Sequence, residues 1–137
     1  MENELIEIKN ENIKNLIYTI RGKQVMLDSD VAMLYNTETR IINQAVKRNS
    51  DRFPERFCFK LNEYEMENLK SQIVISSLRK ENEYGGRRKL PLVFTEQGIA
   101  MLSGLLRNEI AVRVSINIMN AFVEMRKFLT INGQIFD

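Results

Sequence analysis

The 137-residue sequence contains no histidine and only one cysteine, Cys58. Without histidine, the chain lacks the usual general base near neutral pH and the Cys/His set that could hold zinc. The single thiol excludes an intrachain disulfide framework, and it lies inside an apolar strand pattern, which is typical of a structural residue. We therefore expect a protein that is not an enzyme, with no catalytic residue, no metal and no cofactor.

Long apolar runs are also absent from the sequence. No stretch approaches the roughly 18 consecutive apolar residues of a membrane span. The N-terminus lacks the uninterrupted apolar core and the small-residue cleavage site of a secretory signal. These absences predict a cytoplasmic protein without a membrane partner.

A strong overall charge is the third absence. The chain has 20 Lys and Arg against 18 Asp and Glu, a net charge of only +2, so it is no polycation that coats nucleic acid indiscriminately. Residues 36–60, however, contain six cations and three acids, a local surplus of +3. Any contact with nucleic acid must therefore depend on a local patch.

What is present fits a single folded domain. A hydrophobic content of 44% is enough for one core. We expect this domain at residues 16–130, between a lead segment at 1–15 and a tail at 131–137.

The first half of the domain predicts a hairpin, two short helices and a strand. The hairpin covers residues 16–27, around the polar Arg21 and Gly22. Asp28 or Ser29 is expected to cap a helix that runs through Tyr35 and is broken at Asn36 and Thr37. Thr37 should cap a second helix that runs to Arg48. Residues 57–61 alternate like a half-buried strand. This strand should carry the following apolar side chains on one face: Phe57, Phe59 and Leu61.

The second half predicts further short elements and a long helix. A polar helix should start near Asn62, a strand should cover residues 71–77, and residues 79–89 suit a loop or hairpin tip. Residues 90–94 resume as a strand, after which Thr95 caps a helix. The last helix should run from Glu109 to Leu129. The expected fold is therefore α+β: a small winged-helix-like domain with a helix-turn-helix pair, short antiparallel strands and a long C-terminal helix.

Apolar residues in the last helix alternate at spacings of three and four, the pattern of a packed or coiled helix. They are Ala111, Val114, Ile118, Ala121, Met125 and Phe128. This seam can dock on the domain's own core or on a second copy, so a homodimer through the C-terminal helix is one expectation.

The second of the two short helices is the main candidate for a functional surface. Projection of residues 40–48 at about 100° per residue separates two arcs. The inner arc is apolar: Ile41, Ile42, Ala45 and Val46. The outer arc holds only amides and cations, which pair with base edges and phosphates: Arg40, Asn43, Gln44, Lys47 and Arg48. The alternative is a plain surface helix, which usually mixes both signs of charge.

Two further clusters could contact a nucleic-acid backbone. The first consists of Arg48, Asn49, Arg52 and Arg56, which could hold phosphates beside a groove, although Asp51 and Glu55 partly offset their charge. Arg87, Arg88 and Lys89 follow two glycines and would suit a wing along the phosphates or in the minor groove. The alternative for this second cluster is a solvated hairpin tip.

Three stretches of the chain resemble a known family. They are YTIRGKQVMLDSDVAMLYN, INQAVKRNSDRFPERFCFKL and GGRRKLPLVFTEQGIAML. In order and spacing they resemble the phage ORF-six N-terminal domain family, which is similar to the KilA-N and Bro-N domains. The resemblance covers residues 16–129. It implies a DNA-binding module of phage regulators, antirepressors and prophage proteins, and so the cytoplasm of a bacterial host cell.

The family's short motifs fall on definite positions of this chain. Its VKRN element corresponds to residues 46–49, its RFP element to residues 52–54 and its GGRR element to residues 85–88. We expect Phe53, Pro54, Phe57 and the FTEQGIAML stretch to determine the fold rather than to bind a ligand. Members of the family often carry a variable region after this domain, whereas this sequence ends at Asp137.

The expected function is non-catalytic binding of double-stranded DNA by an antirepressor-type regulator. The alternative is a protein-interaction module that sequesters a repressor without binding DNA, which would show affinity without counterion release. A third hypothesis, a metal-dependent nuclease, ranks last because the carboxylates fall in polar segments without the required spacing.

Overall fold

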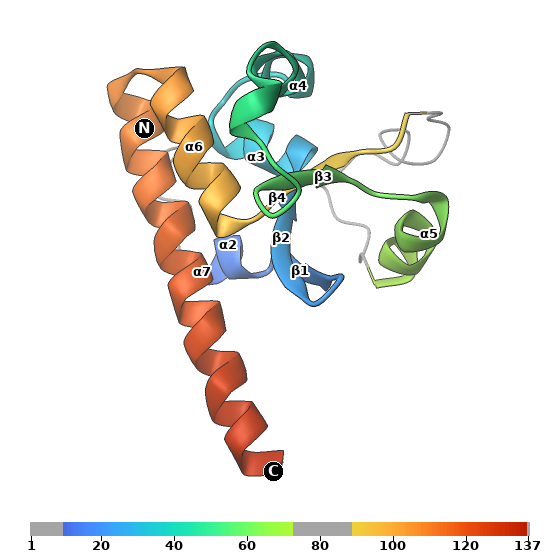
Figure 1. Cartoon of the computed structure of the whole chain (residues 1–137). Helices are drawn as coiled ribbons and strands as arrows, with labels where there is room; N and C mark the ends of the chain where they lie inside the picture. Colours follow the sequence, from blue (N-terminus) through green and yellow to red (C-terminus); the bar gives the residue numbers. More distant parts are fainter. Residues whose placement is uncertain (1–9, 73–88, 137) are drawn as a thin grey trace.

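The computed structural model describes residues 10–72 and 89–136, and in them a four-stranded antiparallel sheet lies between two layers of helices (Figure 1). The strand order is β1-β2-β4-β3. The bounds are β1 Ile17–Ile20, β2 Lys23–Leu27, β3 Cys58–Lys60 and β4 Leu92–Phe94. The predicted α+β class, with short antiparallel strands and a long C-terminal helix, is confirmed.

The predicted hairpin is formed by β1 and β2. Ile20 pairs with Lys23, so the turn contains only Arg21 and Gly22, whose φ angles are 56° and 72°. Two positive φ values are the mark of a type I′ turn, the connection that matches the twist of the flanking strands. The Arg21 guanidinium offsets the cost of this backbone because it binds Glu65 at 2.7 Å and lies over the Phe59 ring.

Each face of the sheet buries its own apolar cluster. One face presents Ile17, Met26, Cys58 and Phe94 to the helices α2, α3, α4, α6 and α7. The other face is covered by α5 (Glu63–Gln72). Its cluster contains Val25, Leu27, Phe59, Leu61, Met66, Leu69 and Val93. The chain therefore builds a three-layer domain with the sheet in the middle.

The prediction that Phe57 shares a face with Phe59 and Leu61 is wrong. β3 begins only at Cys58, because the N–H groups of Phe57 and Cys58 both bind the carbonyl of Pro54 in a turn. Phe57 packs against the first cluster, whereas Phe59 and Leu61 belong to the second.

The polar helix predicted near Asn62 is α5, and a capping box starts it. The Asn62 side chain accepts from the Glu65 N–H at 2.7 Å, and the Glu65 carboxylate accepts from the Asn62 N–H at 2.9 Å. Ser71 and Gln72 lie in this helix rather than in the predicted strand. Residues 73–77 of that strand and residues 79–88 of the predicted loop lie outside the described residues.

Two short helices follow the hairpin as predicted, but both begin differently. α3 (Asp28–Leu34) starts at Asp28 itself, with Leu27 at the N-cap, and α4 (Thr39–Arg48) is preceded by Glu38 rather than Thr37. Neither N-cap side chain forms a capping hydrogen bond. Residues 35–38 connect the helices, and Asn36 takes a φ of 57° there.

The last two helices form one side of the domain. Thr95 caps α6 (Glu96–Leu106) as predicted, since its hydroxyl accepts from the Gly98 N–H. Arg107, with a φ of 47°, separates α6 from α7 (Glu109–Phe136). α7 is longer than predicted because it continues helically through Asn132 and Gly133.

α7 packs on the domain that it belongs to. α2 (Asn10–Lys14) and α6 both lie against it, and its C-terminal end extends past the rest of the domain (Figure 1). Ala111, Ile118 and Ala121 are buried, so the core role of the predicted seam is confirmed, although Phe128 is 58% exposed. No helix in the described part of the chain combines the length and apolar character that crossing a membrane requires.

Candidate nucleic-acid interface

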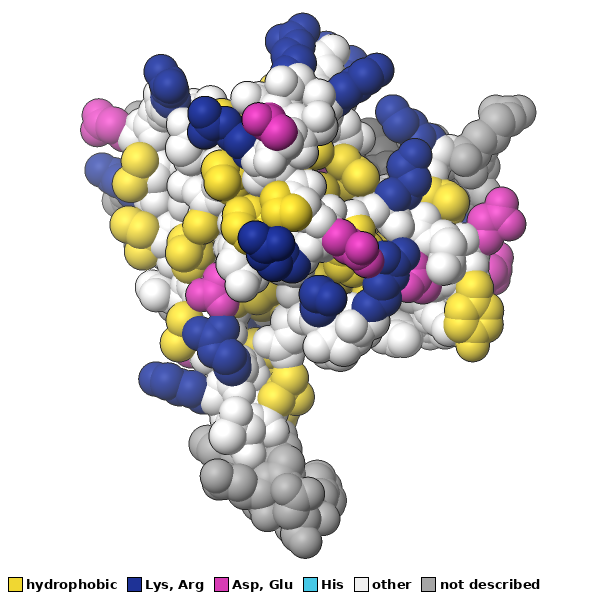
Figure 2. Space-filling view, viewed as in Figure 1, with side chains coloured by type: hydrophobic (Ala, Val, Ile, Leu, Met, Phe, Trp, Pro, Cys, Tyr) yellow, Lys and Arg dark blue, Asp and Glu magenta, His cyan; other side chains and the backbone are white. Residues whose placement is uncertain are grey.

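α4 and the short 3-10 helix η1 (Ser50–Arg52) after it carry most of the candidate residues. Ile42 anchors α4, since its side chain is fully buried, and Ala45 and Val46 pack beside it. On the opposite side Arg40, Lys47 and Arg48 are exposed, and Gln44 is half-exposed. Figure 2 shows Lys and Arg side chains at the top of the view, where Figure 1 places α4.

The division of α4 into an apolar and a polar arc is less complete than the sequence predicts. Ile41, expected inside, is 36% exposed, and Asn43, expected outside, is half-buried with its amide oxygen inaccessible. The helix is rolled so that both residues lie at the borders of its buried face. Asn43 is therefore less accessible than the sequence predicts, and its assignment to a DNA groove stays a prediction.

At one border of that buried face, Asn43 lies beside the buried carboxylate of Asp28. The Asp28 side chain is 4% exposed and also accepts from the Leu92 N–H at 3.1 Å. Burial raises the pKa of Asp28, while the hydrogen bonds from Leu92 and Asn43 oppose that rise. Asp28 thus joins the start of α3, the middle of α4 and the start of β4. Sequence reasoning missed this contact, for which the only signal was an acid directly after the apolar run of β2.

Asn49 has a structural partner as well. Its carboxamide donates to the carbonyl of Ala45 at 2.8 Å and so ends α4. In the VKRN element, Lys47 and Arg48 are therefore the side chains that remain directed outward.

The exposed cations form a strip along α4 and η1. Within the part of the chain that the structure describes, Lys47, Arg48 and Arg52 form no ion pair with an acid. Arg40 pairs with Glu38 at 3.1 Å, but both side chains are more than half exposed. Such surface pairs contribute at most about 1 kcal/mol, so a phosphate can replace the Glu38 carboxylate. We call these four cations, Arg40, Lys47, Arg48 and Arg52, the α4 strip.

The second predicted cluster is mostly outside the described residues. Arg87 and Arg88 lie there, and only Lys89 is placed, with an exposed side chain. Of the predicted DNA-binding residues, the structure thus groups those on α4 and η1.

The aromatic and FTEQG residues hold the framework beneath the strip, as the sequence predicts. Phe53 is buried with its ring edge-on to Phe94 at 6.2 Å. The Thr95 hydroxyl donates to the Arg56 carbonyl at 2.7 Å, and the Thr95 N–H binds the Phe57 carbonyl. A Cβ at Gly98 would overlap that same carbonyl of Phe57, so only glycine lets α6 approach this closely.

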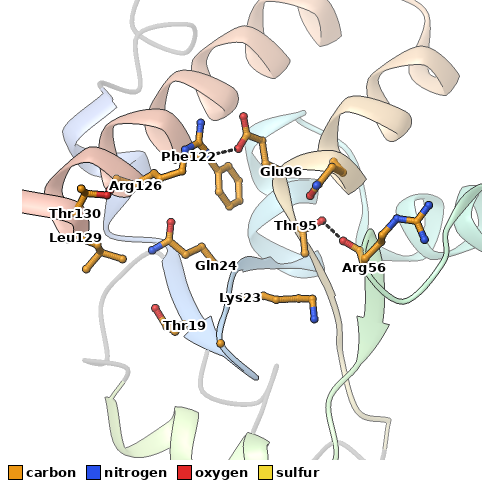
Figure 3. Close-up of a pocket in the computed structure, with 12 residues that line it drawn as sticks. Thr19, Lys23, Gln24, Arg56, Thr95, Glu96, Phe122, Arg126, Leu129 and Thr130 are labelled. Atoms are coloured by element: carbon orange, nitrogen blue, oxygen red, sulfur yellow. Dashed lines mark hydrogen bonds and ion pairs between the residues drawn. The ribbon is translucent and has the colours of Figure 1, made fainter. Parts of the chain in front are cut away.

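A hollow of about 560 Å³ lies on the other side of this framework, between the hairpin, the start of α6 and α7 (Figure 3). Lys23, Arg56 and Arg126 line it, and Glu96 binds Arg126 across it. Thr19, Gln24 and Thr130 add neutral polar groups. Because this lining mixes acid and cations, the hollow differs in charge from the α4 strip.

The single thiol and the clustering of the acidic residues can be described in residues 10–72 and 89–136. Cys58 is buried, and burial raises the pKa of its thiol to about 12, which disfavours the nucleophilic thiolate. Residues 10–72 and 89–136 contain no cluster of three His, Cys, Asp or Glu side chains that could hold a metal ion.

Comparison with known protein families gives a match for this sequence. The model of the ORF6N domain matches residues 15–105, about two thirds of the chain. The chain belongs to the ORF6N family. The match to the ORF6N domain covers the whole sheet, the α4 strip and nearly all of α6, and it ends before α7. No curated protein and no solved structure matched the chain.

Proposed function

We propose that this ORF6N protein binds double-stranded DNA through the α4 strip. The observation that carries the proposal is the set of three exposed cations, Lys47, Arg48 and Arg52, that have no acidic partner among the described residues. Cations in such a row neutralise phosphates and release counterions, which is the main source of affinity for a duplex. Gln44 lies between Arg40 and Arg48 on the same side of the helix and is the side chain best suited to a base edge.

The packing of α4 supports a rigid presentation of this strip. Ile42 is buried, Asn43 lies beside the buried Asp28, and Asn49 closes the helix, so the exposed side is held in one orientation. A short helix held on a preceding helix is the arrangement that helix-turn-helix proteins insert into the major groove. We assign the protein a non-catalytic role as a phage or prophage regulator of the antirepressor type, in the cytoplasm of a bacterial host.

Fluorescence anisotropy with a mixed-sequence duplex tests the proposal. We expect binding that weakens steeply with salt, and Arg48→Glu should weaken it at least about tenfold because it replaces an attraction to phosphate by a repulsion. Gln44→Ala should reduce the preference between duplex sequences more than the overall affinity.

The matched control is Lys70→Glu, which makes the same change of charge on the exposed side of α5. We expect this control to bind as the unmodified protein does. Equal losses in both variants would show that net charge, and not the α4 strip, determines affinity. No binding at low salt would contradict DNA as the ligand and favour the rival function, capture of a repressor protein.

A further inference from the structure

α7 carries a second apolar stripe beside its buried side, and one member of that stripe, Met119, also packs against the first cluster. Val112, Ile116, Met119 and Val123 lie within about 60° of arc on a regular helix. Val112 and Ile116 are each 54% exposed, and Met119 and Val123 are half-buried. Ile118, which is fully buried, lies on the opposite side of the helix. Figure 2 shows hydrophobic side chains along the left of the view, over α6 and α7.

The spacing of this outer stripe is that of a helix–helix seam. Its residues follow one another at steps of four, three and four over about 17 Å of helix. The seam that the sequence analysis assigned either to the core or to a second copy is the inner one, which the core occupies. The outer stripe is therefore the surface of α7 that a second helix can cover.

Four exposed charges beside the stripe indicate which helix fits. Glu109, Arg113, Glu124 and Lys127 all lie on the same side of it, within about 60° of arc. Within one chain Glu124 binds Lys14 of α2 at 3.3 Å, a weak pair at the surface that Arg113 of the partner subunit would replace. When two copies of a helix pair antiparallel, residues on the same side face each other. With Ile116 against Met119 of the partner subunit, Glu109 comes opposite Lys127 of the partner subunit and Arg113 comes near Glu124 of the partner subunit. The charges are thus complementary to their own antiparallel copy, whereas in a parallel pair they would lie on opposite edges of the interface and would not meet.

We infer that the outer stripe of α7 is the interface of an antiparallel homodimer. The inference does not depend on DNA binding. In a two-fold interface each charge pair occurs twice, which doubles the effect of one substitution. The seam is short compared with the interfaces of stable complexes, so we expect dissociation in the micromolar range.

Sedimentation velocity from about 1 to about 300 µM protein tests the dimer. The unmodified chain should pass from monomer to dimer in this range, and Ile116→Glu should remain monomeric. Because Ile116 is more than half exposed, this variant should keep its helical circular dichroism. The control is Tyr64→Glu on α5, where a side chain that is 74% exposed is changed in the same way and dimerisation should persist.

Exchange of the charges tests the antiparallel register. Glu109→Lys and Lys127→Glu should each weaken dimerisation about tenfold, and the double variant should return to within about threefold of the unmodified chain. Glu109 lies at the N-terminus of α7, where a lysine can also destabilise the monomer by an unfavourable interaction with the helix dipole. Lys127→Glu would not reverse that loss of monomer stability. Thermal unfolding at low protein concentration measures the stability of the monomer and so separates it from the affinity of the dimer. A chain that is monomeric throughout, a dimer unaffected by Ile116→Glu, or no restoration in the double variant would each overturn the inference. If the unmodified chain never dimerises and Ile116→Glu lowers the stability of the monomer, the inference is also wrong. That result would show that another segment of the same chain packs on the outer stripe.

Discussion

The carboxylate of Asp28 is buried where α3, α4 and β4 meet, and its environment makes stability depend on pH. Burial raises its pKa above the ordinary value of 3.8. A folded state that binds the proton more tightly than the unfolded chain is stabilised at low pH, and this contribution is lost as the pH rises through the folded pKa. The same carboxylate lies beside Asn43 of α4 and accepts from the Leu92 N–H at 3.1 Å.

Asp28→Asn should remove this pH dependence while keeping an oxygen that accepts from the Leu92 N–H. We expect the free energy of unfolding of the unmodified chain to fall, relative to that of the variant, as the pH rises from about 4 to about 7. Urea unfolding followed by circular dichroism at several pH values measures the difference. The exposed Asp51→Asn is the control and should leave the pH profile unchanged. Parallel profiles for Asp28→Asn and the unmodified chain would show that Asp28 does not titrate differently on folding.

At the scale of the element, two glycines in α6 occupy opposite environments. Gly98 lies against the carbonyl of Phe57, whereas a Cβ at Gly104 would meet nothing within 4 Å. Gly98→Ala should lower the free energy of unfolding by about 1–3 kcal/mol, because α6 must move away from the turn before β3. Gly104→Ala, the control in the same helix, should raise it by about 0.5–1 kcal/mol, because alanine loses less entropy there. Chemical unfolding of both variants checks the prediction, which equal effects would contradict.

The sequence could predict the elements whose structure depends on near neighbours in the chain. The β1–β2 hairpin, the Thr95 cap and the start of α5 depend on residues within a few positions of one another, and all were predicted. The N-cap of α3 was not, because Asp28 is used as a buried partner of Leu92, 64 positions away. The N-cap of α4 is Glu38 rather than the predicted Thr37. The exposure of Ile41 was not predicted either, because the packing of distant residues decides which side of α4 meets the core.

For the whole molecule, the net charge of +2 matters less than its distribution. Four cations in the α4 strip should release about three to four counterions, so the logarithm of affinity should fall with the logarithm of salt with a slope of about −3 to −4. Arg48→Ala together with Arg52→Ala should reduce that slope by about two. Anisotropy titrations at four or more salt concentrations measure the slope, and Lys70→Ala provides the control. A slope near zero in the unmodified chain would rule out phosphate contacts as the basis of affinity.

The sequence by itself determined the α+β class, the order of most elements, the ORF6N family and the position of the cations on α4 and η1. These properties depend on local periodicity, turn residues and caps, which act between near neighbours in the chain. Only the tertiary structure decided that Asn43 turns inward, that the predicted seam of α7 belongs to the core, and that a second apolar stripe remains outside. The reason is that burial depends on which distant residues meet, and the contact of Asp28 with Asn43 and Leu92 joins three elements that no local pattern connects.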